Sequence, residues 1–202
     1  MTLWRGDNPV ILASQSRTRQ ELLSNAGIEA EAIPAEIDER AVQAASGTTA
    51  PSDIAALLAR EKALAVSARH PGRHVIGADQ TLALGDRLFN KPRGRAGAFE
   101  QLRVLAGHSH QLHSAVAVAR DRTILFEHVA VAGMTMRALS EADISAYLAA
   151  AGDAVAASVG AYQLEGLGVH LFERIDGDHF TILGLPLLPL LGFLRGQCLL
   201  AF

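Results

Sequence analysis

The sequence predicts an α/β fold with a mixed, twisted sheet and flanking helices. Short apolar runs typical of strands are interleaved along the chain with segments whose apolar residues recur at helical spacing. Half of the 202 residues are hydrophobic and 19% are charged, so the chain can bury a substantial core. At this length we expect one domain that spans residues 1–202.

The first elements alternate between strand and helix patterns. Val10–Ala13 is a continuous apolar run, and Gln20–Ala26 has apolar residues at helical spacing. Either Ser16 or Thr18 can cap this helix. Ile28–Ile33 alternates apolar and acidic residues, as a half-buried strand does.

The middle of the chain continues this alternation. Ser52–Arg69 has an apolar helical stripe, and Pro51 suits its first turn. Val75–Leu84 is a strand that Gly85 and Asp86 turn into a second short strand. The expected order is therefore helix, strand, turn and strand, with the last strand at Arg87–Asn90.

A helix at Arg95–Ala106 precedes two long strand patterns. Gln111–Ala119 and Thr123–Met136 are separated by a short connection, which predicts a hairpin. Ser140 and Asp143 have the spacing of a capping box and predict the start of another helix.

The C-terminal part is expected to form a loop, a strand and a closing helix. Ser158–Gly168 is rich in glycine, Val169–Ile175 has a strand pattern, and Leu187–Arg195 is a helix opened by Pro186. The apolar stretch Ile182–Leu194 has thirteen residues, fewer than the roughly 20 of a membrane-spanning helix. It therefore predicts buried core.

Charge and cysteine content exclude several classes of protein. Eighteen Lys and Arg against 21 Asp and Glu give a net charge of -3, which is the wrong sign for a protein that coats nucleic acid. The only cysteine, Cys198, cannot form an internal disulfide, and the polar segment Met1–Asn8 lacks the apolar block of a secretory peptide. We expect a cytoplasmic protein with no membrane or nucleic-acid partner.

Two segments place polar groups where packing alone would not. Ser14–Arg19 lies between a strand and a helix, where free N–H groups and the helix dipole favour an anion. A solvated helix cap with two surface arginines gives the same pattern. Asp79 interrupts an apolar strand, which is costly unless the carboxylate is paired or holds a cation. We expect it at a strand end that faces a cleft; the alternative is an aspartate in a turn after Gly77.

Two lysines, an acidic segment and three histidines are further candidates. Lys91 stands next to a proline, and Lys62 borders the apolar side of its helix, although each alone is also typical of a surface lysine. Ile37–Arg40 is interpreted as an acidic loop, either simply exposed or in contact with a ligand. The spacing of the histidines matches zinc motifs poorly, so hydrogen-bonded or exposed side chains are expected at His108, His110 and His113.

Taken in order, these segments resemble the Maf family of nucleoside triphosphate pyrophosphatases, once named for an effect on septum formation. The resemblance runs from Val10 to about Leu194. It rests on residues 12–23, Gly27-Ile28, Ile37-Asp38-Glu39, Glu61-Lys62-Ala63, Gly77-Ala78-Asp79-Gln80, Asn90-Lys91-Pro92, Leu105-Ala106-Gly107-His108, Gly160-Ala161-Tyr162-Gln163, Glu165-Gly166 and Gly184-Leu185-Pro186.

The resemblance implies a fold, a reaction and a set of partners. The fold would be similar to that of inosine triphosphate pyrophosphatases, with a nucleotide cleft between two lobes. The reaction would split a nucleoside triphosphate into the monophosphate and pyrophosphate with the help of a divalent cation, magnesium or manganese. A homodimer is favoured by the resemblance and by the frequency of two-fold dimers.

The resemblance and the chemistry of the side chains together suggest roles. Asp79 would accept a proton from the attacking water. A magnesium ion would bind Glu39, and Asp79 as well if the geometry brings it close enough. The phosphate oxygens would be neutralised or positioned by Ser14, Ser16, Arg19, Lys62 and Lys91.

Thr18, Gln80 and Glu165 are the expected specificity residues. Arg17 stands where the family usually has proline, and Thr18 matches neither the arginine of the dTTP/UTP branch nor the tryptophan of the 7-methyl-GTP branch. Gln80 and the run that begins at Glu165 resemble the 7-methyl-GTP branch, whereas Gly160-Ala161-Tyr162 resembles the dTTP/UTP branch. A carboxylate at 165 can accept hydrogen bonds from the N–H edge of guanine, which favours clearance of a purine or modified nucleotide.

Two other functions use the same residues. A nucleotide-sensing regulator of cell division would bind in the cleft without significant turnover, and such a protein would not need Asp79, which this chain has. A metal-dependent phosphomonoesterase would release orthophosphate instead of pyrophosphate. The identity of the released phosphate distinguishes these classes.

Overall fold

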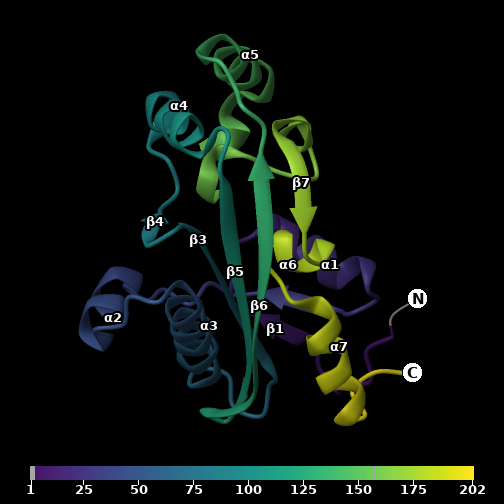
Figure 1. Ribbon diagram of the computed structural model, residues 1–202. Coiled ribbons are helices and arrows are strands. Elements are labelled where there is room, and N and C mark those ends of the chain that lie inside the picture. The colour runs from purple at the N-terminus through teal and green to yellow at the C-terminus, as the bar shows by residue number, and fades with distance from the viewer. Residues whose placement is uncertain (1–2, 157) are drawn as a thin grey trace.

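The computed structural model describes residues 3–156 and 158–202 (Figure 1). Within these residues, seven strands form one sheet in the order β2-β1-β3-β5-β6-β7, with β4 paired to β3 outside this path. The strands are β1 (Val10–Leu12), β2 (Ala30–Ala32), β3 (Val75–Leu84), β4 (Arg87–Phe89), β5 (Ser109–Arg120), β6 (Thr123–Met136) and β7 (Phe172–Asp176). The α/β class with a mixed sheet is confirmed.

Helices connect the parallel strands and cover the sheet. They are α1 (Arg17–Asn25), α2 (Glu39–Ser46), α3 (Pro51–Ser67), α4 (Gly94–Leu105), α5 (Glu141–Ala151), α6 (His179–Ile182) and α7 (Leu187–Gly196), with short 3-10 helices η1 (Gly152–Ala156), η2 (Val159–Ala161) and η3 (Leu167–Leu171). β1 is parallel to β2 and to β3, while β3, β5, β6 and β7 pair antiparallel in turn.

The two faces of the sheet are covered by different helices, because successive side chains of a strand point to opposite faces. α3 packs through alanines on one face, where Ala55, Ala59 and Ala63 meet Ala115, Ala117 and Ala119 of β5. α1 and α7 cover the other face, on which Val116 and Val118 pack with Leu22, Leu23, Leu190 and Leu194. Figure 1 shows α3 and α7 on opposite sides of the β5–β6 hairpin.

A second core lies at the other end of this hairpin. It joins α4 and α5 to the ends of β5 and β6, with Leu102, Leu112, Met134 and Ile144 among its buried members. The long hairpin therefore carries two packed regions, one at each end, as Figure 1 shows. This arrangement agrees with the two lobes that the family resemblance implies.

The strand β3 has an open edge between these two regions. β1 pairs with β3 only at Val75 and Ile76, and β4 pairs with it only at Leu82–Leu84. The residues between them, Gly77–Thr81, are bonded to β5 on one side and pair with no described strand on the other. Side chains from both faces of β3 can therefore reach one space at this edge.

Most strand and helix predictions are confirmed, with the bounds shifted by a few residues. The helix after the polar loop begins at Arg17, because Ser16 and not Thr18 accepts the capping hydrogen bond from the Arg19 N–H. The capping box at Ser140 and Asp143 is present. The hairpin is longer than predicted at its first strand, which begins at Ser109.

Three predictions about elements are wrong. The acidic loop at Ile37–Arg40 is the start of α2, since Asp38 accepts hydrogen bonds from two backbone N–H groups and caps a helix. The strand expected at Val169–Ile175 is split, because η3 occupies the chain up to Leu171 and β7 begins at Phe172. The expected loop before it contains η2, whose end Ala161 has a φ of 61°.

The apolar stretch Ile182–Leu194 is mostly buried core, as predicted. Leu185, Leu187, Leu190 and Leu194 are all nearly inaccessible to solvent. No helix in the described ranges combines the length and apolar character that crossing a bilayer requires.

Candidate active site

A cleft of about 930 Å³ opens at the free edge of β3. The loop before α1, the helices α2 and α3, the segment after β4 and the chain around η2 all contribute to its walls. Every site residue predicted from the sequence lines it: Ser14, Ser16, Thr18, Arg19, Glu39, Lys62, Asp79, Gln80, Lys91 and Glu165. The structure thus brings these residues together, while their individual roles stay predictions.

Asp79 lies in the middle of β3, not at a strand end as expected. It is opposite Ala115 of β5 and has 8% of its surface exposed. The free edge of β3 explains how a residue in the middle of a strand reaches the cleft. The sequence could not show this, because the edge depends on where β1 stops pairing and β4 starts.

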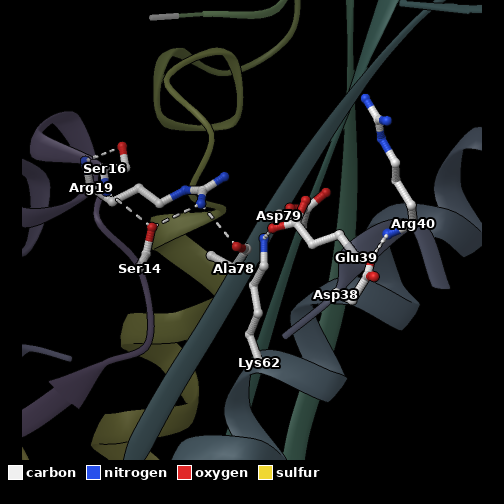
Figure 2. A network of polar contacts seen from close by, with 9 residues as sticks. All are labelled: Ser14, Ser16, Arg19, Asp38, Glu39, Arg40, Lys62, Ala78 and Asp79. Carbon is white, nitrogen blue, oxygen red and sulfur yellow. Dashed lines mark hydrogen bonds and ion pairs between the residues drawn. The ribbon is translucent and has the colours of Figure 1, made fainter. Parts of the chain in front are cut away.

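Lys62 lies between two carboxylates. Its Nζ is 2.6 Å from Asp79 Oδ1 and 2.7 Å from Glu39 Oε1, as Figure 2 shows. The lysine comes from α3 and is buried, whereas the side chain of Glu39 is 51% exposed at the start of α2. The group carries two negative charges and one positive charge, so it can accept further positive charge.

Burial raises the pKa of Asp79 above the ordinary value of an aspartate. The charges of Lys62 and Arg19 oppose this shift, and the carboxylate of Glu39 adds to it. A carboxylate with a raised pKa is a stronger base once it is ionised. This property suits a group that accepts a proton from water.

Arg19 is a buried cation that is held by neutral acceptors. Its Nε donates to the carbonyl of Gly184 at 2.7 Å, and its Nη1 donates to the carbonyl of Ala78 at 2.8 Å and to Ser14 Oγ at 3.2 Å. No described carboxylate forms an ion pair with it. Burial lowers the pKa of Arg19, but an arginine stays protonated in proteins.

The loop before α1 presents polar groups beside this arginine. Ser14 Oγ accepts from the Ser16 N–H, and Ser16 Oγ accepts from the Arg19 N–H (Figure 2). The first turn of α1 contains no acidic residue that would occupy its positive end. Together with Arg19, the N-terminus of α1 favours an anion here.

The expected specificity residues have distinct environments. The Gln80 Nε2 donates to Ser114 Oγ and to the carbonyls of Thr181 and Ile182. These acceptors fix the amide so that its oxygen is left as the group available to a ligand. Gln80 thus offers an acceptor only, although an amide in general both donates and accepts.

Thr18 and Glu165 meet across the mouth of the cleft. Thr18 Oγ1 donates to Glu165 Oε1 at 3.2 Å, which joins the start of α1 to the chain after η2. Both atoms are exposed, so the contact is open to exchange with a ligand. Lys91, from the segment between β4 and α4, is exposed at another part of the rim.

The donor set fits a divalent cation of the magnesium type. Glu39 and Asp79 present carboxylate oxygens to one point, where Lys62 now supplies the positive charge. Magnesium in phosphate-transfer sites is held by one or two carboxylates together with substrate phosphates and water. In the described part of the chain, no cluster of three or more His, Cys, Asp or Glu side chains has metal-binding geometry.

The histidines have structural environments. His110 Nε2 lies 2.7 Å from the Tyr162 hydroxyl, and burial lowers the pKa of His110 to about 4, so the ring is neutral near pH 7. His113 Nδ1 lies 2.7 Å from Ser52 Oγ, and His108 is exposed before β5. The expectation of hydrogen-bonded or exposed histidines is confirmed.

Sequence reasoning missed α2 and with it the position of Arg40. The side chain of Arg40 lines the cleft directly after Glu39. The signals were present: Asp38 is a good N-cap, and Gly47, with a φ of 67°, is a good helix stop. The carbonyl groups of Ala78 and Gly184 that hold Arg19 were also missed, because backbone groups carry no sequence signal.

A comparison with protein-family models matches residues 9–197 to the family described as Maf-like protein. The chain belongs to the Maf family. This result agrees with the segments that carry the resemblance in the sequence, and with a cleft that contains all of its expected polar residues.

Two relatives are similar over nearly the whole chain. A protein from Bradyrhizobium diazoefficiens named nucleoside triphosphate pyrophosphatase is 72% identical over 100% of both chains. A protein from Mesorhizobium japonicum named 7-methyl-GTP pyrophosphatase is 53% identical over 92% of this chain and 94% of the relative. Among solved structures, a HAM1 protein from Coxiella burnetii has a TM-score of 0.40 at 14% identity, over 63% of this chain and 72% of that one.

The Maf cleft can perform a defined kind of chemistry. It combines a buried carboxylate, Asp79, with two cations, Arg19 and Lys62, and with the N-terminus of α1. Cations and N–H groups stabilise negative charge that develops on phosphate oxygens, and the carboxylate can accept a proton. Hydrolysis of a phosphoric anhydride needs both functions.

Proposed function

We propose that this protein hydrolyses a nucleoside triphosphate to the nucleoside monophosphate and pyrophosphate. The observation that carries the proposal is that Asp79, Lys62 and Arg19 are buried on the wall of one cleft. The names of the Maf relatives support it. They also favour turnover over a regulator that only senses nucleotides.

Binding comes first and depends on charge. A triphosphate carries about four negative charges near neutral pH, whose repulsion must be offset before water can approach phosphorus. Arg19 holds the inner phosphate, because its guanidinium is fixed next to Asp79 by the Ala78 carbonyl. Ser14 and Ser16 orient the oxygens, while Lys62 and Lys91 neutralise further charge.

Proton transfer follows. Asp79 accepts a proton from the water that attacks the inner phosphorus, and the pyrophosphate leaves on the opposite side. Lys62 keeps Asp79 ionised by its contact of 2.6 Å. When bound, a magnesium or manganese ion held by Glu39 and Asp79 would supply positive charge to the phosphate oxygens.

The preferred nucleotide is proposed to be a purine or modified nucleotide of the 7-methyl-GTP kind. Glu165 stands at the mouth with an exposed carboxylate, which can exchange the Thr18 hydroxyl for the N–H edge of guanine. Gln80 adds a fixed acceptor. Clearance of such nucleotides in the cytoplasm by a homodimer completes the proposal.

A panel of triphosphates tests this function. The released phosphate is identified for 7-methyl-GTP, GTP, dTTP and UTP, with magnesium and with a chelator. We expect pyrophosphate, loss of turnover on chelation, and the highest kcat/KM for 7-methyl-GTP. Orthophosphate as the product would instead support a phosphomonoesterase, no turnover would support a sensor, and a strong preference for dTTP would reverse the substrate assignment.

A further inference from the structure

We propose that Arg40 is a substrate-binding residue that holds the outer, pyrophosphate end of the triphosphate. The inference rests on the proposed function, since it assigns a further part of the same cleft. Arg40 follows Glu39 in the first turn of α2 and lines the cleft. Arg40 is not among the site residues predicted from the sequence, and it is not part of the cluster of Glu39, Lys62 and Asp79.

The guanidinium of Arg40 is free although acidic residues surround it in the sequence. Asp38 Oδ1 is engaged by the backbone N–H groups of Arg40 and Ala41, and Glu39 is paired with Lys62. Among the residues that the structure describes, none accepts a hydrogen bond from the Arg40 side chain or forms an ion pair with it. The two neighbouring carboxylates are therefore committed elsewhere, and the cation remains available to a ligand.

The charge in the cleft favours a further cation in addition to Lys91. Lys62 is shared by two carboxylates, so that its cluster has a net negative charge. Arg19 is fixed beside Asp79, at the inner phosphate. The outer phosphates carry most of the remaining negative charge of a triphosphate and need a partner beyond this cluster. An arginine suits the task, because its fork can bind phosphate oxygens in pairs.

The order of contacts along the cleft places Arg40 at the outer end. Thr18 contacts Glu165 at the end of the cleft proposed above for the base, and Arg19 follows Thr18 and reaches the Ala78 carbonyl next to Asp79. Lys62 then joins Asp79 to Glu39 on α2. Figure 2 shows Arg19 and Arg40 on opposite sides of the Asp79–Lys62 pair. With the inner phosphorus at Asp79 and the base near Glu165, the leaving pyrophosphate lies toward Arg40.

The helix α2 is built to carry a ligand-binding side chain. None of its residues is buried, so its position depends on the Asp38 cap, the Glu39–Lys62 pair and its contacts with α3. Gln43 also lines the cleft one turn further along. Substitution of Arg40 therefore removes a cleft side chain without disturbing a core.

The affinities of the full chain for the two products, measured by calorimetry, test the proposal without turnover. The probes are inorganic pyrophosphate, in buffer with magnesium, and 7-methyl-GMP, the monophosphate of the proposed substrate. We expect R40Q to weaken pyrophosphate binding at least about tenfold and monophosphate binding less than about twofold. R40K should recover part of the loss, because it restores the charge but not the fork.

The matched control is R195Q, which removes the same charge from an exposed position on α7 outside the cleft. It should bind both products as the unmodified protein does. Equal pyrophosphate binding by R40Q and the unmodified protein would overturn the proposal, as would equal losses for both products or a loss in R195Q. The absence of pyrophosphate release from every triphosphate is a separate outcome that refutes the proposed function, since product binding is measured without catalysis.

Discussion

Asp79→Asn should abolish pyrophosphate release while the protein stays folded. The amide cannot accept the proton that the carboxylate takes from water, so we expect a loss on the order of 10²- to 10⁴-fold in kcat. Folding should survive, because the amide has nearly the same shape and a buried carboxylate has a cost of its own. Pyrophosphate release and the urea midpoint, measured on the same preparation, check both statements.

Asp86→Asn is the matched control for this variant. This substitution makes the same chemical change at Asp86, which lies in the exposed turn between β3 and β4, away from the cleft. It should retain the activity of the unmodified protein. A folded Asp79→Asn variant with near-normal turnover would remove Asp79 from the mechanism, and an unfolded one would show that its role is structural.

Gly77→Ala should destabilise the protein and impair the site together. A Cβ at this position would lie 2.1 Å from the Ala59 carbonyl oxygen and 2.7 Å from the Ala63 nitrogen. Both are backbone atoms of α3, so no side-chain rotation relieves the clash and the helix must move. Overpacking of this kind costs about 1–3 kcal/mol or more. Since α3 carries Lys62, a shift of the helix also disturbs its contact with Asp79.

Gly133→Ala tests whether this effect is specific. Gly133 also lies in a strand of the sheet, but a Cβ there would meet its nearest neighbours at 3.7 Å, which is an ordinary contact. We expect a clearly lower urea midpoint and slower pyrophosphate release for Gly77→Ala, and little change in either for Gly133→Ala. Equal midpoints for the two variants would show that the close packing of α3 on β3 has no such importance.

The fold was largely predictable from local patterns in the sequence. Alternation and apolar runs identify strands, because the face to which a side chain points depends only on its position along the strand. The strand Val75–Leu84 has the bounds that were predicted. The capping box at Ser140 fixes a helix start for a similar local reason. Failures arose where local signals were mixed, as at Ile37–Arg40, whose charges hid the Asp38 cap of α2.

The site was predictable in its residue types but not in its geometry. The cleft exists because β1 stops pairing with β3 at Ile76, and β4 pairs with β3 only from Leu82 onward. This gap depends on pairing between segments that are distant in the sequence, so no local pattern could place Asp79 at an open edge. For the same reason, the sequence did not show that Lys62 contacts two carboxylates. It also did not show that Arg19 donates hydrogen bonds to the carbonyls of Gly184 and Ala78.

Hydrolysis in water labelled with heavy oxygen shows most directly which phosphorus atom the water attacks. If Asp79 activates water at the inner phosphorus, the label must appear in the nucleoside monophosphate, and the pyrophosphate must remain unlabelled. Mass spectrometry of the two products distinguishes the outcomes. Label in the pyrophosphate, or in orthophosphate, would mean that water attacks an outer phosphorus, and would contradict the arrangement of the substrate along this cleft.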